Sequence, residues 1–320
     1  MTTTAKGTIE KRNNVTLVND INKANCITHA GIFHADDVFA TVLLSKLLPA
    51  EARVCRTFKV TDAPEDAFVY DIGGGEFDHH FKGFNVAREN GIKFSSFGLL
   101  WRKYGRDFLS IYFFKKDENP ENYEEIIEQF DKTLVEGIDA TDNGQTEQKT
   151  NVRIQSVSAA ISAFNPNWDE SVSIDERFIE AVDFATKIFD NTLKGVIAKI
   201  KAKTAVEAAI EASKNHIMVL ERFVPWDEHL FNSANPKAEK ILYVVFPSIR
   251  GGYNIQAVPD APGSFGQRKP LPEEWAGLRD KEMADASGVK TATFCHLARF
   301  MCSAENFEDA LLLAEKAVKA

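Results

Sequence analysis

Candidate metal ligands are concentrated between residues 29 and 80, a stretch that holds four of the chain's seven histidines. Imidazole nitrogen and carboxylate oxygen together suit a borderline or hard divalent cation such as Mn²⁺ or Zn²⁺. The candidates are too many for one tetrahedral site but enough for two cations that share a bridging carboxylate. Two such cations polarise a phosphoryl group and lower the pKa of bound water, so the stretch predicts phosphoryl chemistry. The candidate ligand and catalytic residues are His29, His34, Asp36, Asp71, Asp78, His79 and His80.

Short strands and a helix must position these side chains. Residues 25–28 form a strand-like run that ends just before His29, and residues 68–70 form another that ends just before Asp71. Residues 35–48 have helical periodicity, with apolar side chains on one side. Open α/β sheets place their sites at the carboxyl ends of strands, so we expect both residues to lie at one such edge.

The candidates differ in the role that their neighbours indicate. Asp71 is the natural bridging carboxylate. Because adjacent side chains point in different directions, we expect one of His79 and His80 to bind metal and the other to face the substrate or leaving group. Asp78 is placed to orient a histidine ring. Asp37 could be a fourth ligand, but we favour a role in capping the following helix or in supporting the ligands from outside the coordination sphere.

One further carboxylate comes from the segment around residues 137–144. Asp139 and Asp142 compete for this ligand role, since both lie where the helical pattern ends. Asp142 precedes Asn-Gly, so a simple turn is an alternative interpretation.

A basic stretch interrupted by prolines and glycines follows much later in the chain, from Pro259 to Arg279. It carries Ser264, Arg268, Lys269 and Arg279, and Ser287-Gly288 and His296 come after it. Arginine and lysine near small residues can hold a phosphate group, which makes this stretch a candidate substrate-binding region. A solvated basic loop is the alternative. The candidate substrate-binding residues are Ser264, Arg268, Lys269 and His296.

Composition limits the class of protein. The 320 residues are 44% hydrophobic, enough for a sizeable core. The net charge of −9 argues against general adhesion to nucleic acid or anionic membrane. The four cysteines form no C-x-x-C pair, as expected for reduced thiols of an intracellular protein. We find no membrane span and no targeting signal, so the sequence by itself favours the cytoplasm.

The order of expected elements predicts an α/β protein with a doubly wound, mostly parallel sheet and a smaller C-terminal α+β domain. Helix candidates lie at residues 95–104 and 123–134, and a hairpin is expected from residues 241–246 and 253–258. The predicted segments are a flexible N-terminus at 1–24, a metal-binding domain at 25–172, a helical connector at 173–215 and a substrate-binding domain at 216–320. Two core helices are the alternative for the connector.

The motifs together resemble the melanocyte-proliferating-gene-one family (UPF0160), which is related to the DHH phosphoesterases. They are Thr28-His29-x4-His34-x-Asp36, Asp71-Ile-Gly-Gly, Asp78-His79-His80, Asp139-x-x-Asp142-Asn-Gly, the stretch from residue 257 to residue 280, and Ser287-Gly288. The resemblance covers residues 24–318. It implies a DHH-like metal-dependent phosphoesterase fold with a smaller substrate-binding domain. It also implies 3′-to-5′ exonuclease activity on RNA, with nuclear and mitochondrial roles in eukaryotes.

The resemblance implies a ligand assignment as well. His29, His34 and Asp71 would hold one cation, while Asp36, Asp71, His79 and Asp142 would hold the other. Mn²⁺ is favoured, with Mg²⁺ and Zn²⁺ as alternatives. His80 would assist the leaving oxygen.

The first motif of DHH phosphoesterases is His-x3-Asp-x-Asp. In this chain the spacing after the first histidine, His29, is one residue longer, and His34 stands in place of the first aspartate. The chain departs again after His296, where relatives carry glycine-rich residues. Two alternative functions stay open: a small-molecule phosphatase or pyrophosphatase with the same metals, and a non-catalytic, metal-containing regulatory protein.

Overall fold

The computed structural model describes residues 14–116, 122–146, 151–152 and 154–320. The chain divides into two compact units, residues 1–197 (unit 1) and 198–320 (unit 2). Helix α6 (Ile174–Ala212) is one continuous helix of 39 residues that begins in unit 1 and ends in unit 2. The alternative of two separate helices is therefore wrong, in keeping with the absence of proline from this stretch. None of the described helices combines the length and apolarity needed to cross a membrane.

Unit 1 contains a four-stranded sheet in which every pair of neighbouring strands is parallel, as the sequence predicted. The strand order is β1-β3-β2-β4. Its strands are β1 (Val15–Leu17), β2 (Cys26–His29), β3 (Ala52–Thr57) and β4 (Phe68–Val69). The carboxyl ends of parallel strands lie at one edge, so the residues that follow β2 and β4 lie close together.

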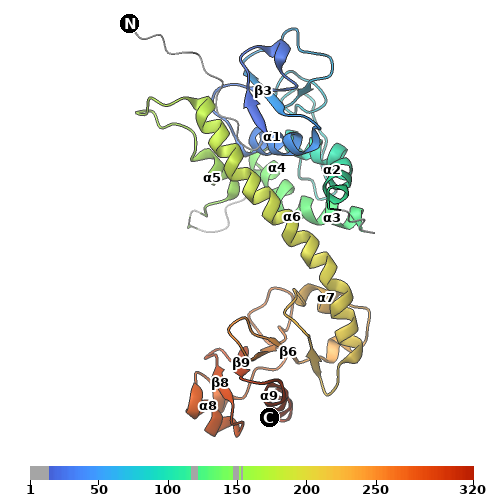
Figure 1. Ribbon diagram of the computed structural model, residues 1–320, viewed down its shortest axis with the longest axis vertical. Helices are drawn as coiled ribbons and strands as arrows, with labels where there is room; N and C mark the ends of the chain where they lie inside the picture. The colour runs from blue at the N-terminus through green and yellow to red at the C-terminus, as the bar shows by residue number, and fades with distance from the viewer. Residues whose placement is uncertain (1–13, 117–121, 147–150, 153) are drawn as a thin grey trace. The chain divides into compact units, whose positions relative to one another are not determined.

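Helices complete unit 1 (Figure 1). They are α1 (Ala35–Leu47), α2 (Ser96–Phe114), α3 (Tyr123–Phe130), α4 (Glu136–Asp142) and α5 (Val157–Ser162), with a short 3₁₀ helix at Ile21–Lys23. Helix α2 continues beyond the predicted end at residue 104, because apolar side chains such as Phe108, Leu109 and Phe113 keep one face buried. The second predicted helix is interrupted by a π-helical turn at Asp131–Val135.

Unit 2 contains a mixed five-stranded sheet in the order β5-β6-β7-β9-β8. Its strands are β5 (Ile217–Val219), β6 (Tyr243–Pro247), β7 (Tyr253–Ala257), β8 (Ala292–Cys295) and β9 (Met301–Ala304). Strands β5 and β6 are parallel, and the other pairs are antiparallel. The predicted hairpin is confirmed by the antiparallel pairing of β6 with β7.

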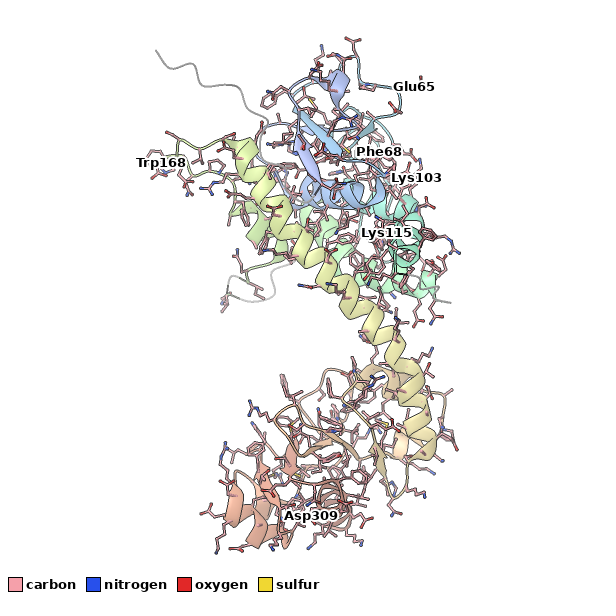
Figure 2. All side chains as sticks on the ribbon, viewed as in Figure 1. Glu65, Phe68, Lys103, Lys115, Trp168 and Asp309 are labelled. Atoms are coloured by element: carbon pink, nitrogen blue, oxygen red, sulfur yellow. The ribbon has the colours of Figure 1, made fainter. Side chains whose placement is uncertain are left out.

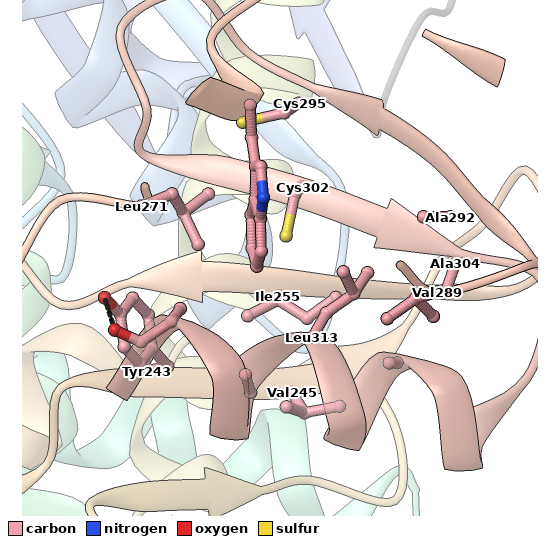
Figure 3. Close-up of a cluster of buried hydrophobic side chains, with 14 of the residues drawn as sticks. Tyr243, Val245, Ile255, Leu271, Val289, Ala292, Cys295, Cys302, Ala304 and Leu313 are labelled. Atoms are coloured by element: carbon pink, nitrogen blue, oxygen red, sulfur yellow. Dashed lines mark hydrogen bonds between the residues drawn. The ribbon is translucent and has the colours of Figure 1, made fainter. Parts of the chain in front are cut away.

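Apolar side chains on both sides of this sheet hold unit 2 together. On one side, Val245 and Ile255 pack with Leu313 of α9 (Phe307–Lys319), as Figure 3 shows. On the other side, Val244 and Phe246 pack with Val206 and Ile210 of α6 and with residues near α7 (Asp227–Asn232). The remaining helices are α8 (Asp280–Ser287) and 3₁₀ turns at Ala238–Lys240 and Glu273–Trp275.

Candidate metal centre

The parallel sheet and two helix starts bring the predicted ligands of unit 1 together. His29 is the last residue of β2, rather than the residue after it, and Asp71 follows β4. Asp71 has a positive φ of 57°, a left-handed conformation that short polar side chains tolerate better than others. Asp36 and Asp37 lie in the first turn of α1. Side chains from the sheet edge and the helix start therefore face one another.

The first group of potential ligands consists of His29, Asp37 and Asp71, whose ligand atoms all lie within 4.8 Å of one another. His29 Nε2 is 3.4 Å from Asp37 Oδ2 and 3.3 Å from Asp71 Oδ2. Asp37 has two functions here. Its Oδ1 accepts a hydrogen bond from the His34 N–H (2.8 Å) and caps α1, as the sequence predicted. Its Oδ2 faces the group, which corresponds to the alternative role of a further ligand that the sequence left open.

The second group consists of Asp36, His79 and Asp142. His79 Nε2 lies 2.9 Å from Asp142 Oδ2. Asp36, which belongs to the first turn of α1, is fully buried, and its carboxylate faces the start of α2. There it accepts hydrogen bonds from the Ser96 N–H (2.9 Å) and the Phe97 N–H (2.7 Å). These backbone donors leave Asp36 little freedom to rotate, so the fold fixes its position before any ligand arrives.

The third group surrounds the two adjacent histidines and consists of Asp71, Asp78, His79 and His80. The side chain of His79 is 6% exposed and that of His80 is 59% exposed. Asp78 Oδ1 lies 3.0 Å from His80 Nδ1, and Asp78 also accepts hydrogen bonds from the Gly74 N–H (2.7 Å) and the His80 N–H (2.9 Å). Asp78 is thereby immobilised and orients the exposed ring, whereas His79 points into the buried cluster.

The electrostatics of the cluster show that it is short of positive charge. No lysine or arginine among the described residues forms an ion pair with Asp36, Asp37 or Asp71. Burial raises the pKa of Asp37 to about 6, and burial together with the charge of Asp36 raises the pKa of Asp71 to about 8. Carboxylates in this situation gain stability from cations.

The two buried histidines respond to the same negative field. Burial by itself would lower the pKa of each ring. The hydrogen bond to Asp71, together with the charges of Asp37 and Asp71, outweighs burial and raises the pKa of His29 to about 9. The hydrogen bond to Asp142, together with the charges of the carboxylates around the ring, raises the pKa of His79 to about 9 in the same way. In the absence of another cation, these rings attract protons because the carboxylates around them need a positive partner.

One atom tests directly whether the cluster fits a metal ion. Asp37 Oδ2 is buried and has no hydrogen-bond partner. A buried carboxylate oxygen without a partner is unfavourable, and a divalent cation bound by the His29 group would satisfy it. The mixture of imidazole nitrogen and carboxylate oxygen also suits such an ion, so the residues fit the predicted metal.

Asp139 and Asp142, which the sequence left as alternatives, lie in different surroundings. Asp142 belongs to the second ligand group, whereas Asp139 belongs to none. Asp139 is fully buried, lies 2.7 Å from Arg88 Nη2 and accepts hydrogen bonds from the Ser95 hydroxyl and the Gly98 N–H. The Ser95 hydroxyl also lies against Asp36, so Asp139 supports the second group from behind.

Arg88 and Ser95 were missed by the sequence interpretation. Arg88 forms a two-pronged ion pair with Asp131, at 2.7 and 2.6 Å, besides its contact with Asp139. Its guanidinium also lies over the ring of Phe94, 4.1 Å from the centroid. No local motif marks these residues, because their partners are distant in sequence and meet only in the folded chain.

His34 lies beside the cluster rather than within a ligand group. Its ring centroid is 5.8 Å from that of His29. His34 lines a cavity of about 850 Å³ together with His80, Asp142, Ser156 and Ala159. The cavity gives a substrate direct access to the exposed ring of His80 and to the second ligand group.

The predicted substrate-binding residues all lie in unit 2, and each has a partner in the neighbouring backbone. Arg268 donates to the carbonyls of Ala238 (2.6 Å) and Ile241 (2.9 Å), and Lys269 donates to the carbonyl of Val318 (2.7 Å). The Ser264 hydroxyl accepts from the Gly266 N–H (3.0 Å), and His296 Nδ1 accepts from the Ala298 N–H (3.0 Å). The positively charged side chains of Arg268 and Lys269 therefore support the fold of unit 2.

The chain matches a known protein family over most of its length. A sequence profile of the family MYG1_exonuc, described as an uncharacterised protein family (UPF0160), matches residues 25–318. No solved structure matches the chain significantly.

Relatives of similar length occur in distant eukaryotes. The MYG1 protein of Dictyostelium discoideum is 31% identical over 90% of this chain and 94% of its own length. The MYG1 protein of Saccharomyces cerevisiae is 32% identical over 94% of this chain and 97% of its own length. The human MYG1 exonuclease is 28% identical over 90% of this chain and 84% of its own length.

Proposed function

This chain belongs to the MYG1 family (UPF0160), and we propose that it is a metal-dependent exonuclease that degrades RNA in the 3′-to-5′ direction with two divalent cations. The observation that carries the proposal is the cluster of three ligand groups, two of which share Asp71, whose buried carboxylates Asp36, Asp37 and Asp71 lack a permanent positive partner among the described residues. The name exonuclease, which human and mouse relatives bear, supports the choice of a nucleic-acid substrate. A DHH-like domain at 25–172, a connector at 173–215 and a substrate-binding domain at 216–320 are part of the proposal.

The proposed ligands divide between two cations. His29, Asp37 and Asp71 hold one, with His34 beside them, and Asp71 also contributes to the other. The second cation takes Asp36, His79 and Asp142. When bound, such cations, with Mn²⁺ favoured, polarise the phosphoryl group and lower the pKa of a bound water.

The protein side chains around these ligands have the remaining tasks. His80 is exposed to the cavity and is held by Asp78, so it can donate a hydrogen bond to the leaving oxygen. Asp36 is fixed by the backbone of α2, and this rigidity preserves the ligand geometry during turnover. Small side chains such as Ser156 and Ala159 also line the cavity and leave room for a nucleotide. Contact of Ser264, Arg268, Lys269 and His296 with the substrate stays a prediction.

The experiment that tests this function is a hydrolysis assay with full-length protein. Single-stranded RNA labelled at its 5′ end should yield a ladder of products shortened from the 3′ end, and only when Mn²⁺, Mg²⁺ or Zn²⁺ is added. Asp142→Asn should lose this activity, because a ligand is removed. Asp107→Asn, which changes an exposed aspartate of α2, is the matched control and should retain it.

Parallel assays distinguish the alternatives. Turnover of pyrophosphate or nucleoside phosphates without shortening of RNA would contradict the exonuclease and favour a small-molecule phosphatase. Stoichiometric metal measured by elemental analysis, together with no turnover of any phosphate ester, would favour a regulatory protein.

A further inference from the structure

We propose that the open half of the unit 2 sheet binds single-stranded RNA, with Arg250 and Arg279 holding backbone phosphates and Phe294 stacking on a base. This inference rests on the proposed function, because it assigns to unit 2 a second contact with the RNA substrate. The surface is named here the β7-β9-β8 hollow. It is defined by a cavity of about 630 Å³ that includes Arg250, Asn254, Arg279, Thr293, Phe294 and Ser303.

The hollow exists because helices cover only part of the sheet. Side chains of β7 alternate, so Ile255 and Ala257 enter the core that α9 covers. On the opposite face, the apolar cluster formed with α6 includes Val244 and Phe246 of β6 but no residue of β7, β8 or β9. The side chains of Asn254 and Ser303 instead line the hollow. A sheet face that is polar and not covered by a helix is accessible to a ligand.

Two guanidinium groups supply positive charge to the hollow. Arg250 and Arg279 are both exposed, and neither forms an ion pair among the described residues. They differ in this respect from Arg88, which is paired with buried carboxylates, and from Arg268, which is bonded to backbone carbonyls. An arginine without an anionic partner keeps its planar donors available, and these match the geometry of a phosphate group.

The turn that carries Arg250 is held close to the sheet. Gly252 has a positive φ of 69° and lies so near the Ala304 carbonyl that a Cβ atom would clash. The Ser248 N–H donates to the Gly252 carbonyl (2.9 Å), and the Arg250 N–H donates to the Ser248 hydroxyl (3.2 Å). The backbone that presents Arg250 is therefore ordered, and binding does not require the turn to fold.

Aromatic rings continue from the hollow along the end of the sheet. The Arg279 guanidinium lies 5.0 Å from the centroid of the half-buried Phe294 ring. The His296 ring is 6.2 Å from Phe294 and 4.5 Å from Phe300, measured between ring centroids. Rings beside unpaired guanidinium groups are typical of surfaces that bind single-stranded nucleic acid, where each ring stacks on an unpaired base.

The remaining groups are consistent with this ligand. Asn254 has no hydrogen-bond partner among the described residues and can donate to or accept from a base edge or a ribose hydroxyl. Glu305 also lines the hollow and opposes a phosphate near it, so we assign the phosphates to the two arginines. A duplex does not present an unstacked base, which is why a single strand fits better.

The test is binding of a fluorescent single-stranded RNA to the full-length protein in EDTA, where hydrolysis does not interfere. Replacing both arginines (Arg250→Ala with Arg279→Ala) should weaken binding by roughly tenfold to a thousandfold. A plot of the logarithm of the binding constant against the logarithm of the salt concentration should also become less steep, by about 0.7 in slope for each lost phosphate contact. Phe294→Leu keeps the site apolar but removes the ring, and it should weaken binding by roughly fivefold to a hundredfold.

The matched control is Arg222→Ala with Lys319→Ala, which removes two exposed positive charges of unit 2 outside the hollow. Equal binding by the arginine pair and by this control, with unchanged thermal melting, would overturn the inference. A second result would overturn the inference as well: the double arginine variant loses binding to a poly-glutamate probe to the same extent as binding to RNA. The hollow would then recognise acidic chains in general.

The outcomes for the two proposals differ. If the hollow binds RNA but no RNA is hydrolysed with added metal, the exonuclease function fails and this inference stands. If RNA is hydrolysed but the hollow variants bind RNA as well as wild type, this inference fails and the exonuclease function stands.

Discussion

The buried side chains of the two units differ in their polarity. Five aspartates are buried among the described residues, and all belong to unit 1: Asp36, Asp37, Asp71, Asp78 and Asp139. In unit 2 the corresponding buried set is apolar except for Ser287 and the Tyr243 hydroxyl, which lies near the Ala317 carbonyl (Figure 3). The charged groups of unit 2 lie near its surface, where arginine and lysine donate to backbone carbonyls, form exposed ion pairs or have no anionic partner among the described residues.

This difference separates stability from function. Burial of charge without a partner is costly, so a protein that retains five buried aspartates gains something other than stability from them. Asp139 has the permanently charged Arg88 as its partner, whereas Asp36, Asp37 and Asp71 have no lysine or arginine partner among the described residues. In unit 2 the core can contribute stability by itself, and recognition is left to the surface.

The largest expected effect comes from Asp71→Asn, which preserves a residue suited to positive φ. Loss of the shared carboxylate should reduce turnover on the order of 10³-fold or more, since it removes several kcal/mol of charge stabilisation. Metal content, measured by elemental analysis, should fall more than for any other single ligand change. In EDTA near neutral pH, however, the variant should melt at a higher temperature than wild type, because burial raises the pKa of Asp71 and a carboxyl with a raised pKa costs stability above its unfolded pKa.

Unchanged metal content in Asp71→Asn would contradict the role of a shared ligand. A lower melting temperature in EDTA would show that the buried carboxylate stabilises unit 1, which would remove the contrast between the units.

The adjacent histidines should show the next largest effect. His79→Ala removes a buried side chain of the second ligand group and should lose one cation. His80→Ala removes an exposed ring and should retain both cations while turnover falls by roughly 10²- to 10⁴-fold, the usual loss for an acid–base residue. Metal analysis and single-turnover kinetics on the same samples distinguish the two. Loss of metal from His80→Ala, with full occupancy in His79→Ala, would reverse the assignment.

Arg88→Met should destabilise unit 1 by about 3–5 kcal/mol, because it leaves the buried Asp139 without its positive partner. The matched control is Lys103→Ala, which breaks the exposed ion pair with Glu76 and should cost much less stability than Arg88→Met (Lys103 is labelled in Figure 2). Denaturant unfolding measures both. Addition of Asp139→Asn to Arg88→Met should recover part of the loss, and the absence of any recovery would argue against an unpaired charge as its cause.

The smallest effect is expected at the half-buried Asp309, in the first turn of α9 in unit 2 (labelled in Figure 2). A hydrogen bond from the Thr291 hydroxyl (2.6 Å) holds the pKa of this carboxyl below its usual value. A lowered pKa in the folded state means that the stabilisation is present above the unfolded pKa and is lost as pH falls through the folded pKa. Wild type should therefore exceed Asp309→Asn in melting temperature near neutral pH, and the difference should shrink below about pH 4. A difference that does not vary with pH would contradict this account.

Much of the fold could be predicted from local patterns. The strand before His29, the helix that begins at Ala35 and the hairpin of β6 with β7 were all expected, because hydrophobic periodicity and turn residues act over a few neighbours. The continuation of α2 beyond residue 104 was not, since it depends on burial of Phe108 and Phe113 against other elements.

The sequence by itself determined which side chains could bind metal and that they follow strands, because residue type and strand ends are local properties. Only the tertiary structure decided how these side chains are shared. It gave Asp37 a free buried oxygen, paired Asp139 with Arg88, and engaged Arg268 with backbone carbonyls while Arg250 and Arg279 stayed open. The physical reason is that the role of a charged group depends on its burial and its partners, and these partners come from distant parts of the chain.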